Sequence, residues 1–181
     1  LLVGNATTEE IGRYALGYKL GMVVRLLSLV PLYMVWSSRM YQVARQPDAS
    51  IHFGKVFTRI LSCYLFVGTG LCLFSPEVVL ILGGEAYLGA VPIVAPIILA
   101  CFFQAASTLM DSTFFIHHKT GTKLGVTLAT TLVMLFLYLA FIPTWGIHGA
   151  AIATFGGFAF LGFAAGGGAV VLAPRVRGVG F

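Results

Sequence analysis

Charged side chains are scarce in this sequence: Asp, Glu, Lys and Arg together make up 9% of the 181 residues. A typical soluble domain carries about 25% charged residues, and a soluble fold could not cover its surface with so few. Hydrophobic residues account for 59% of the chain and gather in long runs. Because a helix needs roughly 20 mainly apolar residues to span a bilayer, the composition predicts an integral membrane protein.

Further absences exclude several functions. The cysteines, Cys63, Cys72 and Cys101, lie inside apolar stretches without Cys-x-x-Cys spacing, which argues against a disulfide framework and against a metal site. The sequence contains neither a glycine loop that would hold phosphate nor a Ser–His–Asp order. We therefore expect no cofactor, no metal and no catalytic residue, and we predict that the chain is not an enzyme.

The apolar runs predict the membrane-spanning helices. They cover about residues 11–36, 56–74, 90–115, 125–142 and 149–172. Backbone polar groups in lipid must be paired within the segment, so continuous apolar runs of this length are expected to be helical. The sequence thus predicts an all-α membrane protein in which residues 1–181 form a single transmembrane bundle of about five helices.

Local signals refine these helices. Residues 7–10, Thr-Thr-Glu-Glu, supply capping oxygens and acids for a helix start. Pro31 removes a backbone hydrogen bond and predicts a kink in the first span. The sequence Ser75-Pro76-Glu77 predicts an N-cap at Ser75 and a short interfacial helix that ends near Gly83.

Glycine spacing predicts close helix contacts. Two pairs, Gly17 with Gly21 and Gly162 with Gly166, have the small-xxx-small spacing that lets helix backbones approach each other.

The connections between the spans alternate in charge. The connections around residues 75–89 and 142–148 contain no Lys or Arg. The other connections and the tail are basic, with Arg39, Arg45, Lys55, Arg59, Lys119, Lys123, Arg175 and Arg177, beside His117 and His118. The positive-inside rule then places the basic connections and the C-terminus in the cytoplasm. The net charge of +5 is spread over separate connections, so we expect no nucleic-acid partner.

Ionisable residues inside the spans are candidate functional residues, because a charge at the bilayer centre costs roughly 2.5–3.5 kcal/mol and usually faces protein or a water-filled cavity. Lys19 and Arg25 lie in the first span and Asp111 lies in the third. The cations could line a cavity for an anionic substrate. Alternatively, Asp111 could form a structural ion pair with Lys19 or Arg25.

A polar stripe precedes Asp111 on the third span. Ser107 and Asp111 are four residues apart and share a helix face, and Gln104 lies on the same side. The stripe could line a substrate pathway or form hydrogen bonds with a neighbouring helix. The candidate substrate-binding residues are Lys19, Arg25, Gln104 and Asp111.

Several segments resemble one family of transporters. Residues 11–19, IGRYALGYK, are similar to a helix entry in bacterial polysaccharide-lipid flippases, and residues 74–87 resemble their periplasmic stretch. The step from Ile142 to Thr154, IPTWGIHGAAIAT, and the basic loop at 118–123 also resemble segments of these proteins. The chain is thereby similar to the oligosaccharide flippase branch of the multidrug/oligosaccharidyl-lipid/polysaccharide exporter superfamily.

The resemblance implies a particular fold and function. Members of this family have two lobes of six helices around a central cavity, and this chain resembles most of the C-terminal lobe. Since it starts at Leu1 without Met, we interpret it as a fragment that lacks the N-terminal lobe. The implied activity is the transfer of undecaprenyl-pyrophosphate-linked oligosaccharide across the bacterial inner membrane by alternating access, during O-antigen, capsule or exopolysaccharide synthesis. The expected partners are membrane lipid, the lipid-linked oligosaccharide and the missing lobe.

Two other functions remain open at this point. A cation-coupled small-molecule or multidrug exporter of the same superfamily would need an acidic ion site, for which Asp111 is the intramembrane acid. A membrane-embedded enzyme of the polysaccharide pathway would be expected to carry a cluster of acids or a large charged loop, and the sequence has neither.

Overall fold

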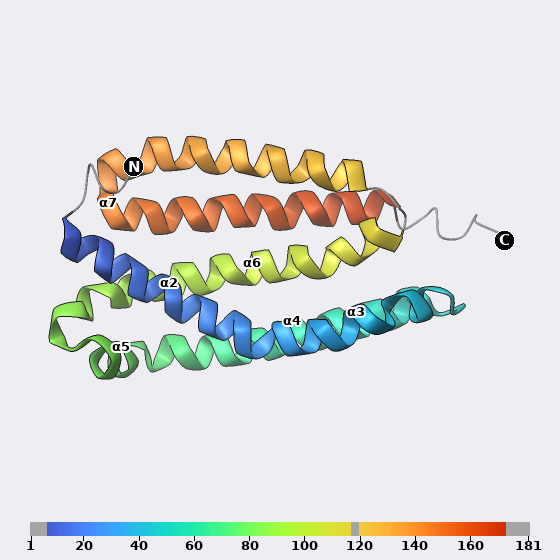
Figure 1. Cartoon of the computed structure of the whole chain (residues 1–181), viewed down its shortest axis with the longest axis horizontal. Coiled ribbons are helices and arrows are strands. Elements are labelled where there is room, and N and C mark those ends of the chain that lie inside the picture. Colours follow the sequence, from blue (N-terminus) through green and yellow to red (C-terminus); the bar gives the residue numbers. More distant parts are fainter. Residues whose placement is uncertain (1–6, 117–119, 173–181) are drawn as a thin grey trace.

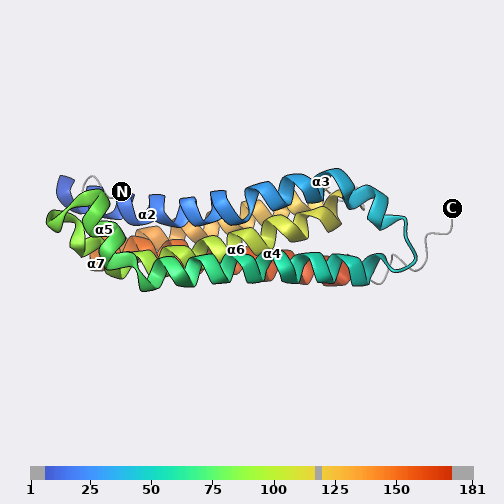
Figure 2. The same cartoon turned by 90° about the horizontal axis from the view of Figure 1, so that it is seen from below.

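The protein is a bundle of helices. The computed structural model describes residues 7–116 and 120–172, and every regular element in these ranges is helical. The helices are α2 (Thr8–Ser28), α3 (Val30–Ala44), α4 (Ala49–Leu73), α5 (Ser75–Gly83), η1 (Glu85–Ala90), α6 (Val91–Ile116) and α7 (Thr120–Leu172). The long helices run side by side along one axis, as Figures 1 and 2 show.

The described helices agree with the predicted class of fold. By length and composition, three helices can cross a membrane, or four if the bent pair α2 and α3 is one span. Large apolar side chains cover the outside of the bundle, among them Phe66, Ile81 and Phe163. An extensive exposed apolar surface of this kind is expected for contact with lipid and would be a liability in water.

The first predicted span forms two helices. Thr7 caps α2 in a capping box with Glu10, which confirms the predicted start. The helix breaks at Leu29, and α3 begins with Pro31 in its first turn. The two helices are bent by 44°, so the kink predicted from Pro31 is present, and α3 continues to Ala44 rather than ending at residue 36.

The second span is longer than predicted, and the short helix after it has a different cap. α4 begins at Ala49 rather than at about residue 56. α5 ends at Gly83 as predicted, but its N-cap is Phe74. The Ser75 hydroxyl donates to the carbonyl of Cys72, 2.8 Å away, and therefore does not cap α5. The predicted N-cap at Ser75 is wrong, because the backbone turns one residue earlier.

α7 folds back on itself at a single residue. Gly146 has φ 54° and ψ −127°, and the chain is helical on both sides of it. The arm that precedes Gly146 and the arm that follows it lie side by side in Figure 1. Met134 packs against Gly157 across the two arms. The connection predicted at residues 142–148 is therefore reduced to a turn at one glycine.

α6 is the central helix of the bundle. It contacts α2, α3, α4, α5, η1 and α7. The predicted glycine contacts are present: Gly17 lies against Ile93 of α6 and Gly21 lies against Ile97. On the second arm of α7, Gly162 lies against Phe103 and Gly166 against Met110. Glycine at these positions lets the backbones of α2 and of the second arm of α7 lie close to α6.

The connections group at the two ends of the bundle. α5, η1 and the turn of α7 lie at one end, whereas the connection between α3 and α4 and the start of α7 lie at the other (Figure 1). Arg45, at the end of α3, and Lys123, near the start of α7, thus belong to the second end. His117, His118, Lys119, Arg175 and Arg177 lie outside the described residues.

Candidate functional site

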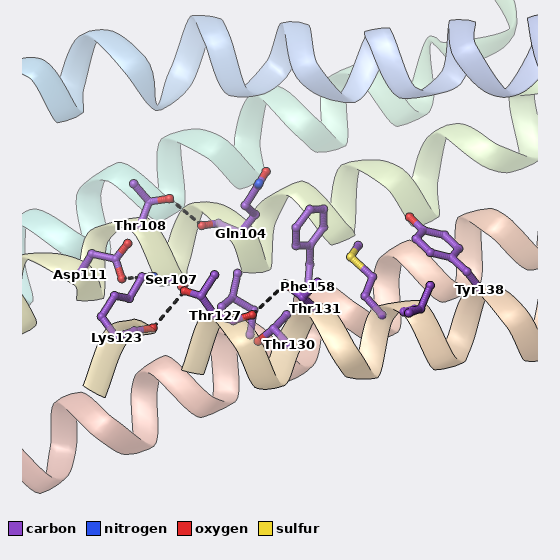
Figure 3. A pocket seen from close by; sticks show the side chains of 13 residues that line it. Gln104, Ser107, Thr108, Asp111, Lys123, Thr127, Thr130, Thr131, Tyr138 and Phe158 are labelled. Carbon is purple, nitrogen blue, oxygen red and sulfur yellow. Dashed lines mark hydrogen bonds and ion pairs between the residues drawn. The ribbon is translucent and has the colours of Figure 1, made fainter. Parts of the chain in front are cut away.

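A polar groove lies between α6 and the two arms of α7. It has a volume of about 540 Å³, and Figure 3 shows the side chains that line it. The lining residues are Gln104, Ser107, Thr108, Asp111, Lys123, Thr127, Thr130, Thr131, Met134, Leu135, Tyr138, Phe158 and Leu161. From Lys123 to Tyr138 the groove follows the first arm for about 22 Å, at 1.5 Å per residue.

An ion pair occupies one end of the groove. Lys123 Nζ lies 2.5 Å from Asp111 Oδ1, and the two side chains are only 23% and 16% exposed. Figure 3 shows the two side chains pointing toward one another from α7 and α6. Each charge lowers the cost of placing the other in an apolar bundle. The sequence left open whether Asp111 lines a pathway or forms a structural ion pair. The structure shows an ion pair, but the partner of Asp111 is Lys123 rather than Lys19 or Arg25.

The hydroxyl groups of the groove have a consistent orientation. Thr108, Thr127, Thr130 and Thr131 each donate to the carbonyl one turn earlier, at 2.8–3.0 Å. A threonine hydroxyl has one proton and two lone pairs, so each of these oxygens retains acceptor capacity. The groove therefore presents several hydrogen-bond acceptors, and the Lys123 ammonium adds donors.

Ser107 is an exception among these hydroxyls. It lines the groove and is 1% exposed. Its Oγ is buried and has no hydrogen-bond partner within the described part of the chain. An unpaired buried hydroxyl costs roughly 1–3 kcal/mol, so a polar group that entered the groove and paired with Ser107 would be stabilised there.

A hydroxyl cluster closes the other end of the groove. Thr154 Oγ1 lies 2.8 Å from the Tyr138 hydroxyl and 3.1 Å from the Tyr14 hydroxyl, and it also donates to the carbonyl of Ala150. Since Thr154 uses its only proton on Ala150, both tyrosines must donate to its oxygen. The cluster joins α2 to both arms of α7.

The structure brings together some of the residues predicted as a site. Gln104 and Asp111 line the groove. Lys19 and Arg25 are not among its lining residues. Lys19 is exposed on α2, whereas Arg25 is partly buried. Arg25 Nε is buried without a hydrogen-bond partner among the described residues.

Sequence reasoning missed the first arm of α7. Thr127, Thr131 and Tyr138 were not predicted as site residues, and Lys123 was predicted only as part of a basic connection, although Lys123, Thr127 and Thr131 are spaced four residues apart and share a helix face. This periodic stripe of polar residues in an apolar helix was the signal available in the sequence. The ion pair itself was not readable, because Asp111 and Lys123 lie on different helices.

Comparison with known proteins identifies no relative of this chain: no protein-family model matches it, and neither a curated protein nor a solved structure is significantly similar.

Proposed function

We propose that this chain is the C-terminal lobe of a flippase that moves undecaprenyl-pyrophosphate-linked oligosaccharide across the bacterial inner membrane by alternating access. The proposed topology has five spans: the bent pair α2 and α3, then α4, α6 and the two arms of α7. The basic connections and the C-terminus face the cytoplasm. The proposal assigns transport without chemical conversion of the substrate, and a further lobe completes the cavity.

The observation that carries the proposal is the polar groove within helices long enough to span a membrane. Polar residues are costly in lipid and usually face a pathway or a partner. Threonine acceptors, the Lys123 ammonium and the Ser107 hydroxyl, which is unpaired in the described part of the chain, fit a ligand rich in hydroxyl groups, which both donates and accepts hydrogen bonds. Arg25, whose Nε has no hydrogen-bond partner among the described residues, suits an anionic group such as a pyrophosphate.

Replacing one groove hydroxyl tests the proposal. Thr131→Val removes a groove acceptor, while Thr58→Val is a matched control, since Thr58 also donates to the carbonyl four residues earlier but lies on α4 outside the groove. In cells that depend on the protein for surface polysaccharide, we expect Thr131→Val combined with Ser107→Ala to reduce export severalfold at equal protein level. Thr58→Val should leave export unchanged.

The cation candidates outside the groove need their own variants. Arg25→Ala and Lys19→Ala in the same assay measure whether an anion contact contributes. Unchanged export in these two variants would remove Lys19 and Arg25 from the mechanism. Normal export in the double groove variant would contradict the proposed use of the groove.

One observation favours a second candidate, a cation-coupled exporter of small molecules. Asp111 places a carboxylate in the groove, where a transported cation could replace the Lys123 ammonium. In this case Asp111→Asn would abolish resistance to a transported drug, whereas polysaccharide export would be normal in cells that lack the protein. The flippase proposal predicts the opposite result for export.

A further inference from the structure

One face of α4 combines cations with an open apolar surface. Its residues are spaced by three or four positions and fall within an arc of about 80°. We call this face the α4 stripe: Lys55, Arg59, Cys63, Phe66, Gly70 and Leu73. Figures 1 and 2 both place α4 along an edge of the bundle. The opposite face of α4, with Ile60 and Tyr64, is buried against the bundle.

The cationic part of the stripe forms no ion pair within the described residues, although Asp48 is the N-cap of α4. Lys55 and Arg59 are exposed, and α4 contains no Asp or Glu. Neither residue forms an ion pair within residues 7–116 and 120–172. Lys55 and Arg59 are one helical turn apart, so both can reach the same anionic group.

The apolar part of the stripe is open and is long enough to accommodate the acyl chain of one lipid leaflet. Phe66 is 83% exposed and Leu73 is 72% exposed. Between them, a side chain added at Gly70 would meet nothing within 4 Å. From Arg59 to Gly70 the helix rises about 16 Å, which is about half of the roughly 30 Å hydrocarbon core.

We propose that the α4 stripe is a binding site for one anionic phospholipid, whose headgroup phosphate lies between Lys55 and Arg59 and whose acyl chain follows Phe66 and Gly70. Charge complementarity selects this occupant, because a zwitterionic lipid would bring its own ammonium beside the two cations together with its phosphate, and an apolar helix would bring no anion. The site lies on a different helix from the polar groove and does not depend on the proposed transport function.

Fluorescence quenching by brominated lipids tests this site. Phe66→Trp places an indole on the stripe, and the parent protein supplies the background from Trp36 and Trp145. The protein is reconstituted in phosphatidylcholine vesicles that contain either brominated phosphatidylglycerol or brominated phosphatidylcholine. Since each basic residue near the surface contributes about 1 kcal/mol to anionic lipid binding, we expect phosphatidylglycerol to be preferred about thirtyfold at the introduced indole.

Charge variants separate the site from general attraction to the membrane. Lys55→Gln with Arg59→Gln should abolish the preference, and each single change should lower it about fivefold. Arg45→Gln is the matched control, an exposed cation at the same end of the bundle but outside the stripe, and it should keep the preference. All substituted side chains are exposed, and circular dichroism verifies that each variant is folded.

Three results would overturn the proposal. Equal quenching by the two lipids would mean that the headgroup is not selected. A preference that survives loss of both Lys55 and Arg59 would place the anion elsewhere. Absence of quenching by either lipid would mean that protein, such as another lobe or a second copy, covers the stripe.

Discussion

At the scale of single residues, the ion pair between Asp111 and Lys123 changes the interpretation of the charged residues in the spans. Asp111 has its partner on the next helix in the chain, so its charge does not need Lys19 or Arg25. Arg25 is then left with a buried, unpaired Nε in the described structure. Of the two cations on α2, Arg25 is therefore the stronger candidate for an anion contact.

The hydroxyl cluster at Thr154 gives a prediction about stability. Thr154→Val removes an oxygen that accepts from both Tyr14 and Tyr138, which leaves two hydroxyls unpaired. We expect the free energy of unfolding to fall by about 1–2 kcal/mol, measured by thermal unfolding in detergent. Thr154→Ser keeps the oxygen and should lose less, and Tyr14→Phe, which leaves the Tyr138 bond in place, should also lose less. Equal stability of Thr154→Val and the parent would contradict the cluster.

At this scale the sequence predicted half of the groove. The stripe of Gln104, Ser107 and Asp111 was visible because residues on one helix have a fixed angular spacing. The residues of α7 that face this stripe could not be predicted, since contacts between helices depend on how the chain packs. The short stretch around Ser75 shows a similar limit, because the choice between Phe74 and Ser75 as N-cap depends on the backbone angles of one residue.

At the scale of elements, the turn of α7 depends on two glycines with different roles. Gly146 has a positive φ of 54°, a conformation that residues with a Cβ rarely adopt. Gly149 lies so close to the carbonyl oxygen of Phe141 that an added Cβ would overlap it. Glycine is needed at position 146 for its backbone conformation and at position 149 because a side chain would not fit there.

Alanine substitutions test these roles. Gly149→Ala should destabilise the protein by about 2–3 kcal/mol, as overpacking does in cores. Gly125→Ala is the matched control on the first arm, where an added Cβ would meet nothing within 4 Å, and its stability should be unchanged or slightly higher because alanine favours helix. Thermal unfolding in detergent measures both. A Gly149→Ala variant as stable as Gly125→Ala would argue against the close contact at the turn.

The long helices were predictable from the sequence and their ends were not. The apolar runs predicted helices at α4, α6 and both arms of α7, since hydrophobicity over 20 residues is a strong signal. The sequence did not predict the polar first turns of α4 or the extension of α3 to Ala44. Helices continue beyond the apolar part wherever no residue breaks them, and such exposed turns carry no hydrophobic signal.

At the scale of the whole molecule, the two ends of the bundle should face opposite sides of the membrane. Single cysteines at Arg45 and at Glu85, in a variant without native cysteines, report this with a reagent that does not cross membranes. From the positive-inside rule, we expect labelling at position 85 in intact cells and at position 45 only after lysis. The reverse pattern would invert the proposed topology, and labelling of both positions in intact cells would exclude it.

The turn at Gly146 has a consequence for how the protein is made. The two helical arms of α7 are joined at one residue, Gly146. No connecting segment is long enough to remain outside the bilayer while the second arm is synthesised. In the proposed five-span topology, the two arms would therefore enter the membrane together, as a hairpin. In that topology the contact between Lys123 and Asp111, which holds the start of α7 against α6, would help to fix the orientation of the whole hairpin.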